Sequence, residues 1–230
     1  MSELIKPTVA IVNFGMGNLF SVKQACFSVG LNASITSSKQ DISSADAVIL
    51  PGVGAFGDAI NTLERLDLIE TLQEAAMSSK PFMGICIGMH LLMSESSEFG
   101  SYHGLGIIKG SVVKLNFPEM PEDRLTKVPH VGWNRIHRAK DNSVNDLWKD
   151  TMLGGLQDRE FMYFVHSFFV KLEDRNIALS MTNYGNLEFC SSLQYKNIFA
   201  CQFHPERSGI CGLHIYKNLV SLINNNAYGG

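Results

Sequence analysis

The chain has 230 residues, of which 45% are hydrophobic and 18% are charged, and its formal net charge is −3 at pH 7. This length and composition predict one large folded domain, or at most two small ones, and they exclude a disordered chain. Lysine and arginine do not gather into the basic cluster that marks a nucleic-acid-binding surface, so we expect no nucleic-acid partner.

The number of cysteines and the N-terminal sequence indicate in which compartment the protein is located. Five cysteines are an odd number without paired spacing, which predicts free thiols in a reducing environment. The first residues, MSELIKPTVAIV, lack the apolar core of a signal peptide. No apolar run approaches the roughly 20 residues of a membrane span. We therefore expect a soluble cytoplasmic protein without a membrane partner.

The first part of the chain predicts alternating strands and helices. Apolar, β-branched runs indicate buried strands, and the longer segments between them indicate helices, with a serine-rich turn after the second strand. The expected strands are 8–14, 32–36, 46–50 and 81–83, and the expected helical segments are 19–29 and 58–79. This alternation is typical of an α/β fold with a mostly parallel, doubly wound central sheet flanked by helices.

After residue 100 the pattern changes to short β-like runs broken by glycine, asparagine and proline, which predict added antiparallel strands. These runs are 110–116, 133–138, 161–165, 168–172, 177–182 and 187–195. The polar, glycine-containing stretch 141–156 predicts a surface loop. A last buried strand is expected at 198–203, and a helix over 212–225 closes the chain.

The pentapeptide GICIG at residues 84–88 lies between an expected strand and the start of an expected helix that includes Met89, Leu92 and Met93. A nucleophile between two glycines at such a turn is the pattern of a nucleophile elbow. The glycines are expected because a Cβ at either position would collide with nearby backbone. The pattern predicts Cys86 as a nucleophile whose thiolate the helix N-terminus favours. The alternative is a buried structural cysteine.

The tripeptide His204-Pro205-Glu206 follows the last expected strand directly. Proline cannot continue a strand ladder, and residues two apart in an extended segment point the same way. We therefore expect the carboxylate of Glu206 to accept a hydrogen bond from one ring nitrogen of His204 while the other nitrogen faces Cys86. This is the base and orienting carboxylate of a catalytic triad. The alternative is an ordinary loop histidine.

Two glycine loops follow expected strands. GMGN at 15–18 lacks the third glycine and the acidic residue of a dinucleotide-binding fingerprint. PGVGAF at 51–56 lies where α/β sheets place their sites, and it is expected either to supply an oxyanion-hole donor beside Cys86 or to be an ordinary turn. His103, His137 and His214 lack metal-ligand spacing, so neither a metal nor another cofactor is expected.

The GICIGM segment at 84–89 together with QFHPE at 202–206 resembles the class I (triad) glutamine amidotransferases, which have a flavodoxin-like fold. More narrowly, GMGN at 15–18, PGVGAF at 51–56, PHVGWN at 129–134 and YFVHS at 163–167 are similar to the glutaminase subunits of imidazole glycerol phosphate synthase. The resemblance spans residues 9–219 and implies a single glutamine amidotransferase domain over 1–230.

The resemblance implies the chemistry of a glutaminase. Cys86 attacks the side-chain amide of glutamine to form a thioester, His204 transfers the proton, and Glu206 orients His204. The oxyanion is held by the N–H of Ile87 and, after a backbone rearrangement, by an N–H of Gly52 or Val53. The residues implied to hold glutamine are Gly54, His90, Glu98, Ser167 and Phe168.

The resemblance also implies a heterodimer with a synthase subunit, a (β/α)₈ barrel, to which ammonia passes for histidine biosynthesis. One glutaminase fold over 230 residues leaves no room for an acceptor-binding domain, which is why a second protein is expected. The residues implied to lie at this interface or along the ammonia path are Asn18, Pro129, His130, Val131, Trp133 and Tyr163.

The sequence departs from the family pattern at three sites. His90 replaces a usual glutamine, Asn13-Phe14 replaces Asp-Tyr, and Phe168 replaces a tyrosine. These differences, with FCSS at 189–192 and ERSG at 206–209, leave a rival open. In that rival the same chemistry supplies ammonia to an N-acetyl sugar amidotransferase with an ATP-pyrophosphatase-like fold, for surface glycans. More remote alternatives are a partner-independent peptidase, deglycase or chaperone with a cysteine elbow, and a non-catalytic binding subunit.

Overall fold

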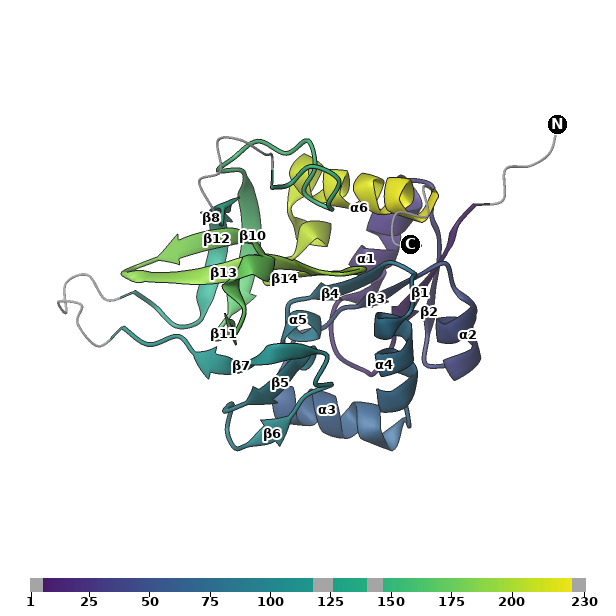
Figure 1. The fold of residues 1–230 in the computed structure, drawn as a ribbon, viewed down its shortest axis with the longest axis horizontal. Helices are drawn as coiled ribbons and strands as arrows, with labels where there is room; N and C mark the ends of the chain where they lie inside the picture. Colours follow the sequence, from purple (N-terminus) through teal and green to yellow (C-terminus); the bar gives the residue numbers. More distant parts are fainter. Residues whose placement is uncertain (1–5, 118–125, 140–146, 225–230) are drawn as a thin grey trace.

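The computed structural model describes residues 6–117, 126–139 and 147–224 (Figure 1). Its central sheet has eight strands in the order β2-β1-β3-β4-β14-β13-β12-β9. The bounds are β2 (Asn32–Thr36), β1 (Thr8–Val12), β3 (Ala47–Leu50), β4 (Phe82–Ile85), β14 (Ile198–Cys201), β13 (Leu187–Tyr195), β12 (Ala178–Tyr184) and β9 (His137–Arg138). The first five strands of this order are parallel, and the other three are added antiparallel.

The parallel part has the flavodoxin-like order 2-1-3-4-5, with β14 as the fifth strand. The predicted α/β fold class is therefore confirmed. Helices cover both faces of this sheet (Figure 1). They are α1 (Leu19–Ser28), α2 (Lys39–Ser44), α3 (Phe56–Arg65), α4 (Ile69–Met77), α5 (Ile87–Leu91) and α6 (Gly209–Asn224).

Side chains of β1 alternate between two hydrophobic cores, as the two-residue period of a strand requires. Val9 and Ile11 belong to the core that contains buried residues of α1 and α6. Ala10 and Val12 belong to the core that contains buried residues of α3 and α4. A sheet buried on both faces needs continuous apolar strands, which explains why 8–12 and 47–50 are almost wholly apolar.

Two smaller sheets lie beside the antiparallel end of the central sheet. One pairs β8 (His130–Arg135) with β10 (Phe161–His166) in antiparallel fashion. The other has the order β11-β7-β5-β6, made of β11 (Phe168–Leu172), β7 (Ile108–Lys114), β5 (Met93–Ser96) and β6 (Tyr102–His103). The prediction of antiparallel additions is confirmed for most of these pairs, whereas β5 and β7 are parallel.

Three local predictions were wrong. The serine-rich turn contains α2, in which the Ser38 hydroxyl accepts a hydrogen bond from the Asp41 N–H. The helix after the nucleophile ends at Leu91, because Met93–Ser96 pair with β7 as strand β5. Residues 147–156 are not a surface loop: Trp148 is fully buried and its indole N–H donates to Leu179 O at 2.8 Å. The remainder of that predicted loop, 141–146, lies outside the described residues.

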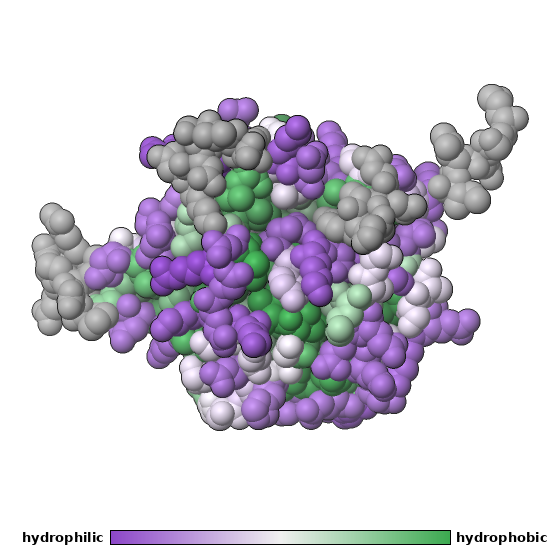
Figure 2. Space-filling model, viewed as in Figure 1, coloured by the Kyte–Doolittle hydropathy of each residue, from purple (hydrophilic) through white to green (hydrophobic). Residues whose placement is uncertain are grey.

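Hydrophilic side chains cover the periphery of the face seen in Figure 2, over α2 and α3, and hydrophobic ones gather near the centre of the view. Within the described ranges, no helix combines the length and apolar character that crossing a bilayer requires.

Candidate active site

Three adjacent parallel strands bring the predicted motifs to one edge of the sheet. Leu50 at the end of β3 is in register with Gly84 of β4, and Cys201 at the end of β14 is in register with Ile85. The loop 51–55, Cys86 and the segment 202–206 directly follow these strand ends. Ligand sites of open α/β sheets lie at such carboxyl ends, so the topology itself assembles the candidate site.

Cys86 has the strained backbone of a nucleophile elbow, with φ 53° and ψ −106°. Few residues with a side chain adopt a positive φ, and the surrounding hydrogen bonds must hold it. The N–H of Cys86 donates to Cys201 O at 2.8 Å, and its carbonyl accepts from Met89 N at 2.9 Å. A Cβ on Gly88 would lie 1.7 Å from Leu50 O. The expected collision at the flanking glycine is therefore confirmed.

The thiol of Cys86 is almost completely enclosed, since the residue is 5% exposed. Its Sγ lies 3.8 Å from Val165 O and 3.7 Å from Gln202 Nε2. The following helix has a single turn's length, so its contribution to a negative charge on sulfur is limited to the N–H groups of that turn.

His204 and Glu206 form the expected pair: Nδ1 of the ring lies 2.8 Å from Oε1 of the carboxylate, and both side chains are buried. The local backbone differs from the extended segment that was predicted. Pro205 starts a short 3₁₀ helix, η3 (Pro205–Arg207), and this tight turn carries Glu206 back to the ring. The Ser208 hydroxyl donates to His204 O at 2.7 Å and holds the turn.

Charge interactions join His204 to the cysteine. Burial disfavours the protonated ring, but charge and hydrogen bonding from Cys86 and Glu206 outweigh it and raise the pKa of His204 to about 10. No hydrogen bond with good geometry links Sγ to the ring in the described part of the chain, where His204 Nε2 is buried and without a partner. The ring is thus an imidazolium at neutral pH, with its N–H on Nε2 unpaired near the sulfur.

A cavity of about 270 Å³ opens beside the thiol. All the residues predicted to hold glutamine line it, together with two of the predicted oxyanion-hole residues. Its lining is Val53, Gly54, Cys86, Ile87, His90, Glu98, Pro129, Val165, His166, Ser167 and Phe168. Sequence reasoning missed Val165 and His166 as lining residues. Their position in the YFVHS segment was the available signal.

The third predicted oxyanion residue, Gly52, lies behind this lining. A Cβ there would be 2.4 Å from Ile87 Cγ2, and a Cβ on Gly17 would be 2.8 Å from Gly52 Cα. The first glycine loop therefore lets two backbone segments touch. This contact explains the second glycine of the Gly-x-Gly pattern, and the first, Gly15, has a φ of 80°, which glycine adopts without strain.

Two polar side chains at the cavity are buried and partly paired. His90 Nε2 lies 2.8 Å from Gln202 Oε1, while His90 Nδ1 has no partner among the described residues. Burial lowers the pKa of His90 to about 4, so its ring is neutral. Glu98 accepts the N–H of Phe56 at 2.9 Å, at the start of α3, and burial raises the pKa of its carboxyl.

His130 does not lie on the surface, although it belongs to the predicted interface segment. Its ring stacks on Tyr184, and its Nδ1 lies 2.9 Å from His166 Nε2. His166 Nδ1 donates to Phe168 O at 2.9 Å, which makes His166 Nε2 the acceptor and His130 Nδ1 the donor. Burial lowers the pKa of His130 to about 4 and that of His166 to about 3, so both are neutral.

The other predicted interface residues lie outside this buried pair. Val131 and Trp133 alternate outward on β8 and are 56% and 55% exposed. Trp133 meets Tyr163 of β10 edge to face at 6.0 Å, and the Arg207 guanidinium lies 4.3 Å from the Tyr163 ring centroid. Asn18 is exposed, and its side chain caps α1 by accepting the N–H of Ser21 at 3.2 Å.

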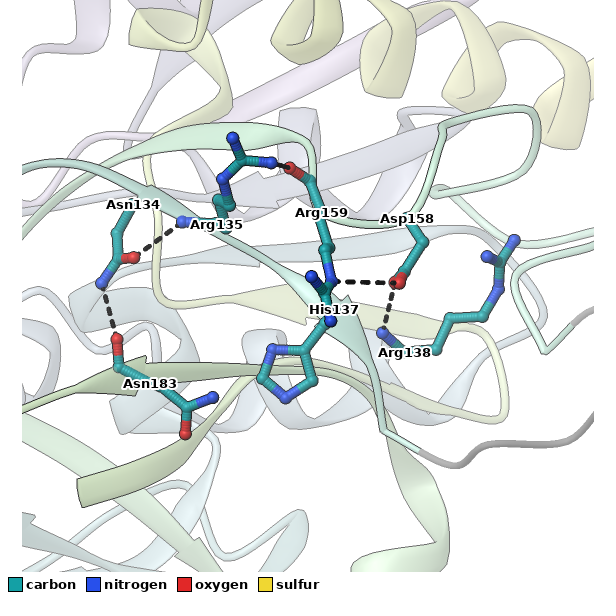
Figure 3. Close-up of a pocket in the computed structure, with 7 residues that line it drawn as sticks. All are labelled: Asn134, Arg135, His137, Arg138, Asp158, Arg159 and Asn183. Atoms are coloured by element: carbon teal, nitrogen blue, oxygen red, sulfur yellow. Dashed lines mark hydrogen bonds and ion pairs between the residues drawn. The ribbon is translucent and has the colours of Figure 1, made fainter. Parts of the chain in front are cut away.

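A larger cavity, about 680 Å³, contains none of the predicted site residues (Figure 3). Its lining is Asn134, Arg135, His137, Arg138, Asp158, Arg159 and Asn183. The Asp158 carboxylate accepts from Arg138 N at 2.9 Å, and the Asn134 amide donates to Asn183 O at 2.9 Å. Over the described ranges no group of three or more His, Cys, Asp or Glu side chains has the arrangement of a metal site.

Comparisons with known proteins agree with this geometry. Residues 10–219 match the family described as glutamine amidotransferase class-I. The chain is 41% identical over 209 residues to the imidazole glycerol phosphate synthase subunit HisH of Aquifex aeolicus, covering 90% of this chain and 93% of that protein. It is also 41% identical over 215 residues to the subunit of the same name from Caldanaerobacter subterraneus, covering 94% and 98%.

Among solved structures, PurLQS from Thermotoga maritima superposes with a TM-score of 0.66 at 18% identity, covering 96% of this chain and 99% of that one. This likeness bears on the fold, and the closer sequence relatives bear on the family. The chain belongs to the class I glutamine amidotransferase family, within the branch of imidazole glycerol phosphate synthase subunit HisH.

Proposed function

We propose that this protein is the glutaminase subunit of an imidazole glycerol phosphate synthase and supplies ammonia for histidine biosynthesis. The observation that carries the proposal is the enclosed Cys86 on a strained elbow, in a site where the His204 ring is hydrogen-bonded to the buried Glu206 carboxylate. Its relatives at 41% identity are named as subunits of that synthase, which favours this function over ammonia supply to a sugar amidotransferase.

In the proposed reaction the Cys86 sulfur attacks the side-chain carbonyl carbon of glutamine. The tetrahedral intermediate collapses with cleavage of the C–N bond, and the proton on His204 goes to the leaving nitrogen, which departs as ammonia. Water then attacks the thioester while His204 accepts its proton, and glutamate and the thiolate are released. Glu206 keeps Nδ1–H in place and stabilises the ring whenever it is charged.

The residues that line the cavity also provide the donors of the proposed oxyanion hole. The N–H of Ile87 is placed at the first turn of α5, and a second oxyanion donor would come from Val53 after the loop around Gly52 and Gly54 rearranges. Val53 is 42% exposed, which suits a movable loop.

Glutamine would be held by side-chain and main-chain groups of the same cavity. His90 Nδ1 can accept an amide or ammonium N–H, and the Glu98 carboxylate suits the α-ammonium group. The backbone of Gly54, Ser167 and Phe168 would provide further contacts.

The partner in this proposal is the synthase subunit, a (β/α)₈ barrel, in a heterodimer. It would dock on the surface formed by the exposed Val131 and Trp133 and the half-buried Tyr163, with Pro129 at the cavity mouth, His130 behind the surface and Asn18 at its edge. We propose that residues 1–230 form one glutamine amidotransferase domain that acts in the cytoplasm. All five cysteines are free, which suits a reducing compartment.

The experiment that tests the function uses the complex. The chain is purified with its native partner, the partner is identified, and glutamine-dependent formation of imidazole glycerol phosphate is measured. In the Cys86→Ala complex we expect synthesis to be lost with glutamine and kept with ammonium salts. Glutaminase activity in that variant would remove Cys86 from the mechanism, and an ATP-pyrophosphatase-like partner would assign the chain to the sugar pathway.

A further inference from the structure

Gln202 lies between two residues of the candidate site and has no role in the chemistry described so far. It follows β14, is completely buried, and its backbone N–H donates to Ser191 O at 2.9 Å. Its side-chain Oε1 lies 2.8 Å from His90 Nε2, and its Nε2 lies 3.7 Å from Cys86 Sγ. One amide thus bridges a buried ring and the reacting sulfur.

The hydrogen-bonding groups of His90 and Cys86 determine which way the Gln202 amide is oriented between them. His90 is neutral and carries one N–H. When that N–H is on Nε2 it donates to Gln202 Oε1, and the amide NH₂ faces the sulfur. The opposite amide orientation would aim an oxygen lone pair at a thiolate, which is repulsive. A charged sulfur therefore requires the observed arrangement, and a neutral His90 with its N–H on Nε2 is compatible with it.

The sulfur needs this donor because its other close polar contact is an acceptor. As a thiol, Cys86 can donate to Val165 O at 3.8 Å. With the proton on His204 Nε2 the sulfur is a thiolate, which that carbonyl repels, whereas the Gln202 N–H attracts it. Hydrogen bonds to charged groups are stronger than neutral ones, so the bond strengthens when the thiolate forms.

We infer that Gln202 is a further catalytic residue: its side-chain N–H stabilises and aims the Cys86 thiolate, and His90 is the positioning residue that holds the amide. The inference rests on the proposed nucleophilic role of Cys86. It gives His90 a second task besides glutamine binding, because its Nε2 side serves the sulfur while its Nδ1 side faces the cavity.

The test measures the reactivity of the thiol itself, without glutamine or partner. The rate of Cys86 alkylation by iodoacetamide at pH 7 is followed by mass spectrometry in the wild type and in Gln202→Met, which keeps the volume but removes the N–H. We expect the rate to fall about tenfold, as the loss of one hydrogen bond to a charged group predicts. His90→Leu should lower it by a smaller factor because the amide loses its anchor.

Gln194→Met is the matched control, because the Gln194 amide donates to Lys196 O at 2.7 Å on β13 and does not reach the sulfur. This variant should be alkylated at the wild-type rate. In complex with the partner, Gln202→Met should lower kcat for glutamine by the same factor as alkylation and leave ammonium-dependent synthesis unchanged. Wild-type alkylation of folded Gln202→Met would overturn the inference.

A measurement on proteins that keep Gln202 covers the case in which Gln202→Met does not fold. In the ¹H–¹⁵N correlation spectrum of the wild type, one side-chain amide proton of Gln202 should be shifted downfield relative to an ordinary glutamine amide. That downfield shift should be lost in Cys86→Ala. Identical Gln202 amide shifts in the two proteins would overturn the inference. The alkylation rate and the amide shift do not depend on glutamine turnover, so the inference can fail while the proposed glutaminase function stands, and the reverse.

Discussion

Gly88 is the residue of the elbow at which an added side chain would meet the closest backbone contact. Its Cα packs against the end of β3, so that a methyl group would lie 1.7 Å from Leu50 O. The backbone carbonyl cannot move without disturbing the loop 51–55, which follows it. The same contact that makes the turn tight therefore links the nucleophile to the candidate oxyanion loop.

Gly88→Ala is expected to destabilise the protein by more than about 3 kcal/mol, the upper end of typical overpacking costs, because a backbone atom blocks the new Cβ. Urea unfolding followed by circular dichroism measures the effect. Gly84→Ala is the comparison: its Cβ would lie 3.0 Å from Gly88 O, so we expect a smaller loss. Equal stability of Gly88→Ala and the wild type would show that the close approach does not exist.

At the scale of elements, one face of the strand pair β8 and β10 lies towards the cavity, and the other face forms the proposed partner surface. The inward face contributes the His130 and His166 pair beside the candidate cavity, and the outward face presents Trp133 and Tyr163. The two sets of side chains lie on opposite faces because successive residues of a strand point to opposite sides of the sheet. A partner that moves these strands can therefore act on the cavity through the backbone of 165–168.

Trp133→Ala is expected to weaken binding of the synthase partner about tenfold or more, because exposed aromatic anchors dominate protein interfaces. Isothermal titration calorimetry measures the affinity, and the melting temperature of the isolated chain should change little. Phe27→Ala is the control, since Phe27 is 71% exposed on α1, outside the proposed surface. Unchanged affinity for Trp133→Ala would place the interface elsewhere.

The loop 51–55 is the element expected to respond to the partner. We predict that the isolated chain is a poor glutaminase and that the partner raises kcat about a hundredfold, the effect of one oxyanion donor. Val53→Pro, which lacks the N–H, should lose most of this stimulation. Glutamate release is assayed with and without partner. Full activity of the isolated wild-type chain would contradict a loop that must rearrange.

At the scale of the whole molecule, three buried histidines are neutral rings: His90 and His166 line the cavity, and His130 contacts His166. Burial lowers the pKa of His90 and His130 to about 4 and that of His166 to about 3, from an ordinary value of 6.5. The unfolded chain binds protons at these residues more readily than the folded one does. The stability that these three neutral rings contribute is therefore complete above pH 6.5 and is lost as the pH falls towards 4.

We expect the free energy of unfolding to fall between pH 6.5 and pH 5, with a slope that rises from about one proton taken up on unfolding at pH 6.5, where His204 opposes the three rings, towards about three at pH 5. Urea titrations at several pH values give this slope directly. The exposed His103 provides a control, because His103→Asn should keep the slope. A free energy that stays constant from pH 7 to pH 5 would mean that these rings are already accessible to protons in the folded protein.

The sequence by itself determined the approximate positions of the buried strands, the elbow at Cys86 and the pairing of His204 with Glu206. These features are encoded within a few consecutive residues, where glycine, proline and apolar periodicity restrict the backbone directly. It did not determine the 3₁₀ turn at Pro205, the early end of α5 or the burial of Trp148. Those depend on pairing and packing with segments elsewhere in the chain.

Only the tertiary structure decided how the site is completed. Gln202 and His90 are 112 positions apart, and His130 and His166 are 36 apart, yet each pair shares a buried hydrogen bond. No local pattern announces such contacts, because they arise when sheet register and strand alternation bring two inward side chains to the same place. The sequence alone predicted the nucleophile Cys86 and the His204–Glu206 pair. The roles of Gln202 and His90 beside the sulfur could be inferred only from the folded structure.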